Sequence, residues 1–187
     1  MSQTGVSDDA PALNALYERF RRPIHSYAYR LLGSHEDADD VTQEVFVRLF
    51  IAWDGLQDRD TLSAWLYRLA TNLSIDLLRR RKRLFWRSLT PRKRDDEHDG
   101  DALGDEGFFL PPDDGGIPAI AEREHIRLAI ARMPEEYAAV LVLNAAQGVP
   151  YQEVAAIVGI SPSAAATRIS RAKKLFVEHY QRISQTF

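Results

Sequence analysis

An acidic segment near the middle of the chain most limits how it can fold. Between Asp95 and Ile120 there are nine acidic residues and no lysine or arginine, with Pro-Pro and Gly-Gly pairs and little apolar periodicity. Such a segment buries too little apolar surface to offset the entropy lost on ordering it, so residues 95–118 are predicted to be a flexible linker. The chain is therefore expected to form two small domains, residues 1–94 and residues 119–187.

The net charge of −3 conceals a segregation along the chain. Residues 1–94 carry 16 basic and 12 acidic side chains, and residues 121–187 carry 8 basic and 6 acidic ones. Two mildly basic ends thus flank a strongly acidic middle. This asymmetry bears on the choice of partner rather than on the fold, and it leaves nucleic acid open as a partner of either end.

The composition excludes several classes of protein. The chain has no cysteine, which rules out disulfide bonds, cysteine-ligated zinc and thiol redox sensing within it. No stretch approaches the roughly 18 apolar residues of a membrane span. The first ten residues are polar and acidic rather than signal-like. We therefore expect a cytoplasmic protein that makes no membrane contact itself.

Helical periodicity covers the first half of the chain. It predicts helices over residues 12–32 and 34–53 and a third from residues 61–63 into the arginines that end at Arg83, with Pro23 as a kink or break and Ser34 as an N-cap. The second and third helices each carry an apolar stripe: Ala38, Val41, Val45, Leu49 and Ala52, then Leu62, Leu66, Leu69, Leu73 and Leu77. No period-two alternation is long enough for a strand, so the fold class is all-α.

The second half resembles a helix-turn-helix in its spacing. Helices are predicted over residues 119–133, 134–147, 150–158 and 162–181. Ala155 is small where two helices would cross, Gly159 tolerates a positive φ in the turn, and Ser161 can cap the last helix. That helix offers basic side chains to phosphates or base edges in a major groove, namely Arg168, Arg171, Lys173 and Lys174. An ordinary helical hairpin with a solvated basic end remains an alternative, and the motif alone fits a repressor equally well.

The third helix carries a second candidate for nucleic-acid binding. Spacings of three and four place Arg68, Asn72, Asp76, Arg79 and Arg83 on one face, opposite the leucine stripe. Arginines can follow a backbone, nearby Trp65 and Tyr67 can stack on unpaired bases, and an asparagine can read a base edge. The alternative is a solvated helix end with the aromatic rings in the core.

The second helix holds an acidic cluster that has three interpretations. Glu36, Asp37, Asp39, Asp40 and Glu44 could bind magnesium, but no second acidic cluster faces them on another helix. Acids near a helix N-terminus explain the first two. The remaining polar face also contains Gln43 and Val47, and Phe46 and Phe50 flank it, which favours docking onto a partner helix. We expect no metal and no cofactor.

Three motifs together resemble one family. Asp39–Phe46 (DDVTQEVF) resembles the polymerase-binding segment of sigma region 2, and Ser63–Asn72 (SAWLYRLATN) resembles the adjoining promoter-melting segment. Pro134-Glu135-Glu136-Tyr137 with the helix-turn-helix resembles sigma region 4. Order and spacing agree across nearly the whole chain with the extracytoplasmic-function (ECF) sigma factors. The resemblance implies a non-enzymatic transcription initiation factor with a region 2 domain, a linker and a region 4 domain.

The resemblance also implies roles for individual residues. It implies that the clamp coiled coil of the polymerase largest subunit is bound by Asp39, Asp40, Gln43, Glu44 and Val47. It implies that the minus-ten element is bound by Trp65, Arg68, Asn72, Asp76, Arg79, Arg80 and Arg83, with a pocket shaped by the loop Leu56, Gln57, Asp58, Arg59 and Asp60. It implies that the minus-35 element is bound by Ser163, Ala166, Thr167, Arg168, Arg171, Lys173 and Lys174.

One departure from the family weakens the last assignment. Ala164 and Ala166 stand where the family usually has a hydroxyl and a basic side chain, so direct reading of minus-35 bases is expected to be slight. The implied partners are core RNA polymerase, at its clamp and flap regions, promoter DNA and an anti-sigma factor. A stand-alone helix-turn-helix regulator is the alternative, but it leaves the Asn72 face and the acidic docking face without a role.

Overall fold

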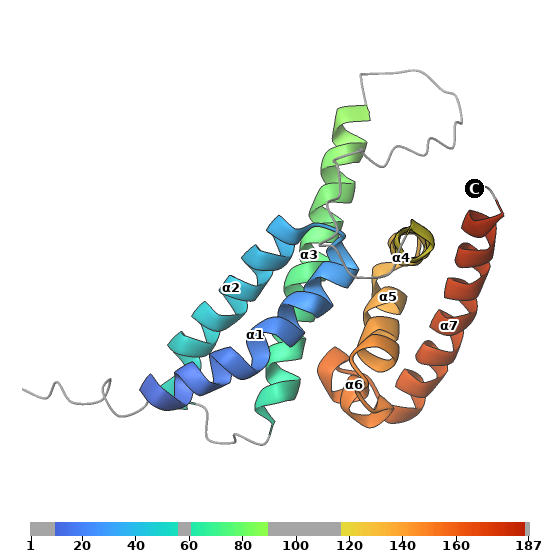
Figure 1. Ribbon diagram of the computed structural model, residues 1–187. Coiled ribbons are helices and arrows are strands. Elements are labelled where there is room, and N and C mark those ends of the chain that lie inside the picture. The colour runs from blue at the N-terminus through green and yellow to red at the C-terminus, as the bar shows by residue number, and fades with distance from the viewer. Residues whose placement is uncertain (1–9, 56–60, 90–116, 186–187) are drawn as a thin grey trace, which may run out of the picture.

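The computed structural model describes residues 10–55, 61–89 and 117–185, and all of its regular elements are helical (Figure 1). No strand occurs in these three ranges, so the predicted all-α class is confirmed. The first half contains α1 (Ala10–Leu32), α2 (His35–Ala52), the 3-10 turn η1 (Trp53–Gly55) and α3 (Leu62–Leu89). The second half contains α4 (Ile117–Ala131), α5 (Glu135–Leu141), the π-helical turn η2 (Val142–Ala146), α6 (Tyr151–Val158) and α7 (Pro162–Ser184).

Helix α1 runs without interruption through Pro23, so of the kink or break predicted there the break is wrong. A proline inside a helix removes one backbone hydrogen bond and crowds the preceding turn. Here the turn after the proline is fixed by tertiary packing, because Ile24, Tyr27 and Ala28 are completely buried against the neighbouring helices. Burial of that apolar face outweighs the local cost of the proline.

The start and the core stripe of α2 agree with the prediction. Gly33 ends α1 with a φ of 71°, and the Ser34 hydroxyl accepts a hydrogen bond from the Asp37 backbone N–H at 3.3 Å. This cap satisfies one of the amide donors that a helix leaves open at its N-terminus. The predicted stripe is buried at Ala38, Val41, Val45 and Leu49, whereas Ala52 is only half-buried.

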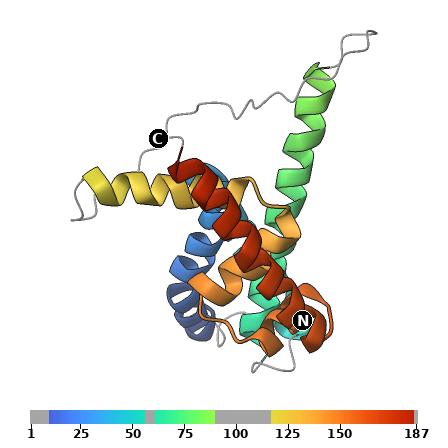
Figure 2. The ribbon, with the colours of Figure 1, turned by 90° about the vertical axis from the view of Figure 1, so that its right-hand side faces the viewer.

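The second half forms a compact group of helices around α7, which crosses it from end to end (Figure 2). Gly159 has a φ of 74° in the turn between α6 and α7, and the Ser161 hydroxyl accepts a hydrogen bond from the Ala164 N–H at 3.2 Å. Ala155 is buried where α6 meets α7. The predicted helix-turn-helix geometry is therefore present.

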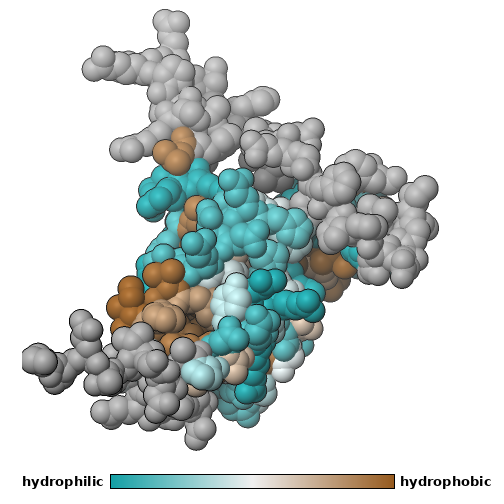
Figure 3. All heavy atoms as spheres, turned by 60° about the vertical axis from the view of Figure 1, so that its left-hand side comes forward, coloured by the Kyte–Doolittle hydropathy of each residue, from teal (hydrophilic) through white to brown (hydrophobic). Residues whose placement is uncertain are grey.

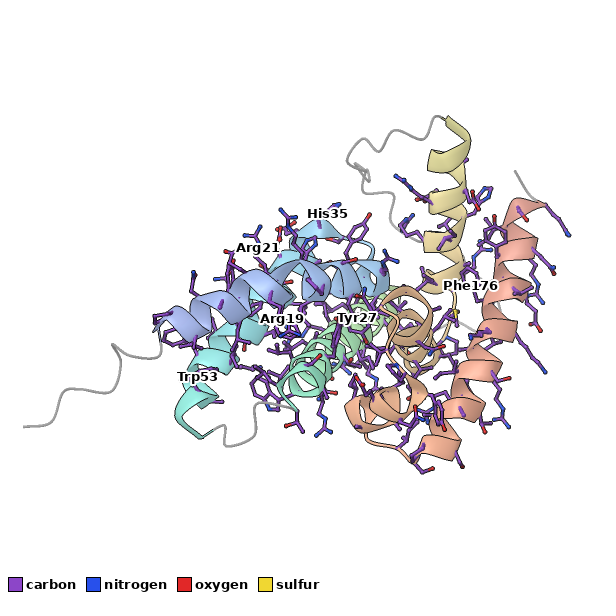
Figure 4. All side chains as sticks on the ribbon, turned by 60° about the horizontal axis from the view of Figure 1, so that its bottom comes forward. Arg19, Arg21, Tyr27, His35, Trp53 and Phe176 are labelled. Atoms are coloured by element: carbon purple, nitrogen blue, oxygen red, sulfur yellow. The ribbon has the colours of Figure 1, made fainter. Side chains whose placement is uncertain are left out.

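The two halves share one apolar core. Tyr27 of α1 lies in the middle of the molecule, where α1 meets α3 and the helices of the second half (Figure 4). Its ring meets that of Tyr67 edge-on, with 5.6 Å between the centroids. The Thr71 hydroxyl donates to the Tyr67 carbonyl at 2.7 Å, so the Tyr27 hydroxyl is the donor in its 2.8 Å bond to Thr71 Oγ1. The first-half core continues into Val140 and Leu143 of the second half.

The predicted linker, residues 95–118, lies almost wholly outside the described residues, and α4 begins slightly before residue 119. Within the residues that the structure describes, no helix is both long and apolar enough to cross a membrane.

Candidate functional site

A groove runs between α1 and α2 on the side of the molecule away from the second half (Figure 3). It has a volume of about 690 Å³. Helix α1 contributes Tyr17, Arg21, Arg22 and His25 to it, and α2 contributes Asp39, Thr42, Gln43, Phe46, Val47 and Phe50. The C-terminal end of α2 forms an apolar patch beside the groove, because Val47, Phe50 and Ile51 are 45%, 62% and 80% exposed.

Charges of opposite sign line the two walls of this groove. Arg21 and Arg22 from α1 supply the positive charges, Asp39 from α2 supplies the negative one, and Gln43 adds a neutral amide. The pKa of His25 is lowered from 6.5, because burial disfavours the charged ring and outweighs the attraction of Asp39. His25 Nε2 lies 3.3 Å from Asp39 Oδ1, which joins the two walls of the groove.

The acids of α2 lie close to basic side chains. Asp37 pairs with Arg81 of α3, Asp39 meets His25 of α1, and Glu44 Oε1 lies 2.7 Å from Arg48 Nε. In the described ranges, no group of three or more acidic, histidine or cysteine side chains could hold a metal ion. Three of the acids of α2, Asp37, Asp39 and Glu44, thus have basic neighbours within the chain.

The polar face of α3 has the predicted orientation. Arg68, Asn72 and Asp76 are exposed, as are the basic side chains further along the helix at Arg79, Arg80 and Arg83. Trp65 is half-buried, so part of its ring can be reached. Tyr67 is only 7% exposed and packs on Tyr27, which identifies it as a core residue rather than a platform for bases.

Part of this α3 face lies against the second half of the molecule. Arg68 donates a hydrogen bond to the Ala156 carbonyl near the end of α6. Arg79 Nη2 lies 3.3 Å from Glu136 Oε1, and Lys82 Nζ lies 2.6 Å from Glu135 Oε1. The Tyr67 hydroxyl donates to Gln147 Oε1 at 3.3 Å. Arg68 and Arg79, two of the cations expected to meet DNA, thus have partners within the chain.

The predicted recognition helix, α7, separates a buried face from an exposed one. Ala165, Ile169 and Ala172 are buried against the rest of the second half. The opposite side is exposed at the predicted positions Ser163, Ala166, Thr167, Arg171, Lys173 and Lys174, and Arg168 is half-buried. The Thr167 hydroxyl donates to the Ser163 carbonyl at 3.0 Å, which holds it along the helix.

The predicted minus-ten loop, residues 56–60, lies outside the described residues. Sequence reasoning missed two other groups. The α1 wall of the groove could have been found from Tyr17, Arg21 and His25, which recur at intervals of four. Glu135 and Glu136 were named only within the motif that resembles sigma region 4, and no local pattern indicates that they reach α3.

Comparison with known families matches both halves of the chain. Residues 16–84 match the family model described as sigma-70 region 2, and residues 123–176 match the one described as sigma-70 region 4. The first range contains the groove and the exposed face of α3. The second contains Glu135, Glu136 and the helix-turn-helix.

Individual relatives and solved structures agree with these matches. The ECF RNA polymerase sigma factor SigE of Mycolicibacterium smegmatis is 29% identical over 91% of this chain and 62% of its own length. SigW of Bacillus subtilis is 29% identical over 89% of this chain and 87% of its own length. The fold resembles RpoE of Bartonella quintana in complex with the anti-sigma factor NepR, with a TM-score of 0.71, 20% identity and coverage of 92% of this chain and 98% of that one. It also resembles CnrH in complex with the cytosolic domain of CnrY, with a TM-score of 0.65, 24% identity and coverage of 92% and 89%.

The first half matches sigma-70 region 2 and carries the groove, and the second half matches sigma-70 region 4 and carries the helix-turn-helix. The chain therefore belongs to the sigma-70 family. Within that family it is an ECF sigma factor, since its relatives across most of its length carry that description.

Proposed function

We propose that the chain is an alternative sigma subunit, a non-enzymatic protein that binds core RNA polymerase, directs it to promoters and helps to open them. One observation carries the proposal. The segment matched to region 2 presents an open docking groove on α1 and α2 and an arginine-rich face with Asn72 on α3. A protein that only binds duplex DNA needs neither feature.

The groove between α1 and α2 is the proposed polymerase-binding site. Its apolar lining residues, Phe46, Val47 and Phe50, suit a partner helix, and its charged side chains can fix the orientation of that helix. We assign the contact with the clamp coiled coil of the largest subunit to Asp39, Asp40, Gln43, Glu44 and Val47. The second half of the molecule would meet the flap region. Residues 1–94 and 119–187 would act as the two functional domains, joined by residues 95–118.

The exposed face of α3 is the proposed minus-ten interface. An asparagine reads an adenine or another base edge well once the base has left the stack, and arginines bind the adjoining phosphates. Asn72 would read the flipped base and Trp65 would stack beside it. The remaining contacts are assigned to Arg68, Asp76, Arg79, Arg80 and Arg83, and the pocket to residues 56–60.

Helix α7 is the proposed minus-35 reader. Its exposed side carries Arg171, Lys173 and Lys174, which suit phosphates, and Arg168 lies beside them. Because Ala164 and Ala166 carry no polar group, this helix would contribute position and affinity more than base selection. Ser163 and Thr167 complete the assigned set.

An anti-sigma factor is the proposed regulatory partner. Two solved structures with this fold are RpoE in complex with the anti-sigma factor NepR and CnrH in complex with the cytosolic domain of CnrY. A protein that acts on polymerase and chromosomal DNA would work in the cytoplasm, without membrane contact of its own.

Transcription in vitro tests the proposal directly. Purified chain, core polymerase lacking any sigma factor and sheared genomic DNA would be combined, and transcript 5′ ends sequenced. Discrete start sites that depend on the chain are expected. Duplex binding by the chain alone, without any chain-dependent start, would instead support a stand-alone regulator.

A further inference from the structure

A second pocket lies between α1 of the first half and α4 of the second. It has a volume of about 300 Å³ and is lined by Ser26, Tyr29 and Arg30 of α1 and by Arg123, Ile126, Arg127 and Ile130 of α4. Of the described residues that line it, three are arginines and none is acidic. It shares no lining residue with the groove between α1 and α2. A concave site on which several guanidinium groups converge is suited to an anion.

Arg127 is held in a fixed position at this pocket. Both carboxylate oxygens of Glu124, three residues earlier on α4, accept hydrogen bonds from its guanidinium group, and the bond from Nε to Oε2 measures 2.8 Å. Its Nη1 also lies close to Gly33, where an added Cβ would come within 3.3 Å of it. An arginine presents five N–H donors in a rigid fork, more than one carboxylate can use. A guanidinium group that is already oriented loses little freedom when it binds a ligand.

The charge around the pocket is positive in excess. Arg30, Arg123 and Arg127 bring three positive charges, and Glu124 beside them brings one negative charge. The hydrogen bond from Arg127 holds the pKa of Glu124 below its ordinary value of 4.5, so this carboxyl group is ionised at neutral pH. Three positive charges less one negative leave an excess of two in this group. A phosphate monoester carries a matching charge of about −1.5 to −2 at neutral pH.

The rest of the pocket suits a flat or apolar group. Ile126 is 37% exposed and Ile130 is buried, and the Tyr29 ring is stacked on His35 with 4.2 Å between the centroids. This stack holds the tyrosine ring in one orientation. Ligand pockets in proteins begin at about 300 Å³, which is several times the room that a water-sized group needs. A phosphate ion by itself would leave this apolar surface without a partner.

We propose that the pocket between α1 and α4 binds a nucleoside monophosphate. The phosphate lies among Arg30, Arg123 and Arg127, and the base lies against Tyr29 and Ile126. This site does not depend on the proposed sigma function, and none of its residues belongs to the assigned polymerase or DNA contacts. Because the ligand touches an element of each half, its binding stabilises the folded chain as a whole.

Calorimetric titration of the full chain tests the proposal. The probes are adenosine and guanosine 5′-monophosphate, with inorganic phosphate and adenosine as the two fragments. At least one nucleotide should bind about tenfold or more tightly than either fragment, because only the intact nucleotide uses both the arginines and the apolar surface. At about 100 times its Kd it should raise the Tm by about 5–10 °C. Equal affinity for inorganic phosphate would overturn the assignment of the base.

A pair of matched variants tests the arginines. Arg30→Gln with Arg123→Gln should weaken nucleotide binding by at least about tenfold, since each removes charged donors to the phosphate. Arg127 is kept, because it also pairs with Glu124 and packs near Gly33. Arg19→Gln with Arg182→Gln removes the same charge at exposed positions of α1 and α7 that do not line the pocket, and should bind as the parent does. Equal weakening in both variants would show a general effect of charge and overturn the site.

Nuclear magnetic resonance on the parent chain locates the ligand without any substitution. Backbone amide shifts caused by the nucleotide should centre on residues 26–30 and 123–130. Shifts that centre on α3 or α7 instead would mean that the nucleotide imitates nucleic acid at the proposed DNA contacts, and would overturn the pocket. The absence of both heat and shifts at about 1 mM ligand would overturn it as well. Transcription in vitro tests the sigma function separately, and each of these outcomes leaves that function as it was.

Discussion

The α1–α2 groove and the exposed face of α3 belong to the same three-helix unit, but they differ in how far other parts of the chain contact them. In the groove region, Phe50 and Ile51 remain 62% and 80% exposed, and every lining residue comes from α1 or α2. On α3, Arg79 and Lys82 are paired with carboxylates from the second half. The difference teaches that the groove region carries exposed apolar side chains with no partner element over them, whereas part of the α3 face already has charged partners within the chain.

Charge reversal in the groove region should have the largest effect. Asp40→Arg with Glu44→Arg reverses two charges on the face assigned to polymerase, and like charges placed together in an interface cost several kcal/mol. We expect at least about a 100-fold loss of affinity for core polymerase, measured by co-purification and by fluorescence anisotropy. Neither side chain is buried, so circular dichroism should show an unchanged helix content.

Glu122→Arg with Glu178→Arg is the matched control, because it makes the same charge change at exposed positions of the second half. This control should assemble with polymerase nearly as well as the parent chain. Undiminished assembly of the Asp40 and Glu44 variant would remove the acidic face of α2 from its assigned role, and with it the contrast between the two interfaces.

Truncation of Asn72 should have the next largest effect, and it should act on the other interface. Asn72 is exposed, and alanine favours a helix more than asparagine does, so Asn72→Ala should fold normally. Loss of one good base contact is typically worth about 1–3 kcal/mol, so promoter opening should fall by about 10-fold to 100-fold. Permanganate footprinting of the melted region would measure this, while polymerase affinity should stay within about twofold. An equal loss in both measurements would show that Asn72 serves polymerase binding.

Much of this arrangement could be predicted from the sequence, because local rules specify it. The α2 cap at Ser34, the left-handed turn at Gly159 and the buried stripe of α2 each follow from spacing and residue type. The exposed positions on α3 and α7 follow from the same helical periodicity. The break at Pro23 was wrong because tertiary packing of α1 outweighed a local preference.

The contacts between the halves could not be predicted in this way. Lys82 and Glu135 are separated by the whole acidic segment, and nothing in the spacing of either brings them together. Tyr67 was open to two interpretations, and only its contacts with Tyr27 and Gln147 identify it as part of the core. Long-range packing of this kind depends on how two preformed surfaces fit, which periodicity does not encode.

Acidification should have the smallest effect, and at the α3 interface it should act through Glu135. Burial by itself would raise the pKa of Glu135, but the hydrogen bond from Lys82 and the charges of Lys82 and Arg79 outweigh it and hold that pKa below its ordinary value of 4.5. A carboxyl group whose pKa is lower when the two halves are packed together stabilises that packing. Its contribution is fully present when the pH is above the ordinary pKa. That contribution is lost as the pH falls through the depressed value.

The fraction of chains in which the two halves are apart can be measured from the distance between spin labels at Asn14→Cys in α1 and Gln181→Cys in α7. We expect this fraction to stay constant from about pH 7 to about pH 5 and to rise by about twofold below that. The rise is small because Lys82 is largely exposed to solvent. The Glu135→Gln variant has no titratable group at this position. Its two halves should therefore be apart more often at neutral pH, and that fraction should change less with acid. Should both chains open equally at low pH, general acid destabilisation of the helices would explain the change, and Glu135 would have no special part in holding the second half over α3.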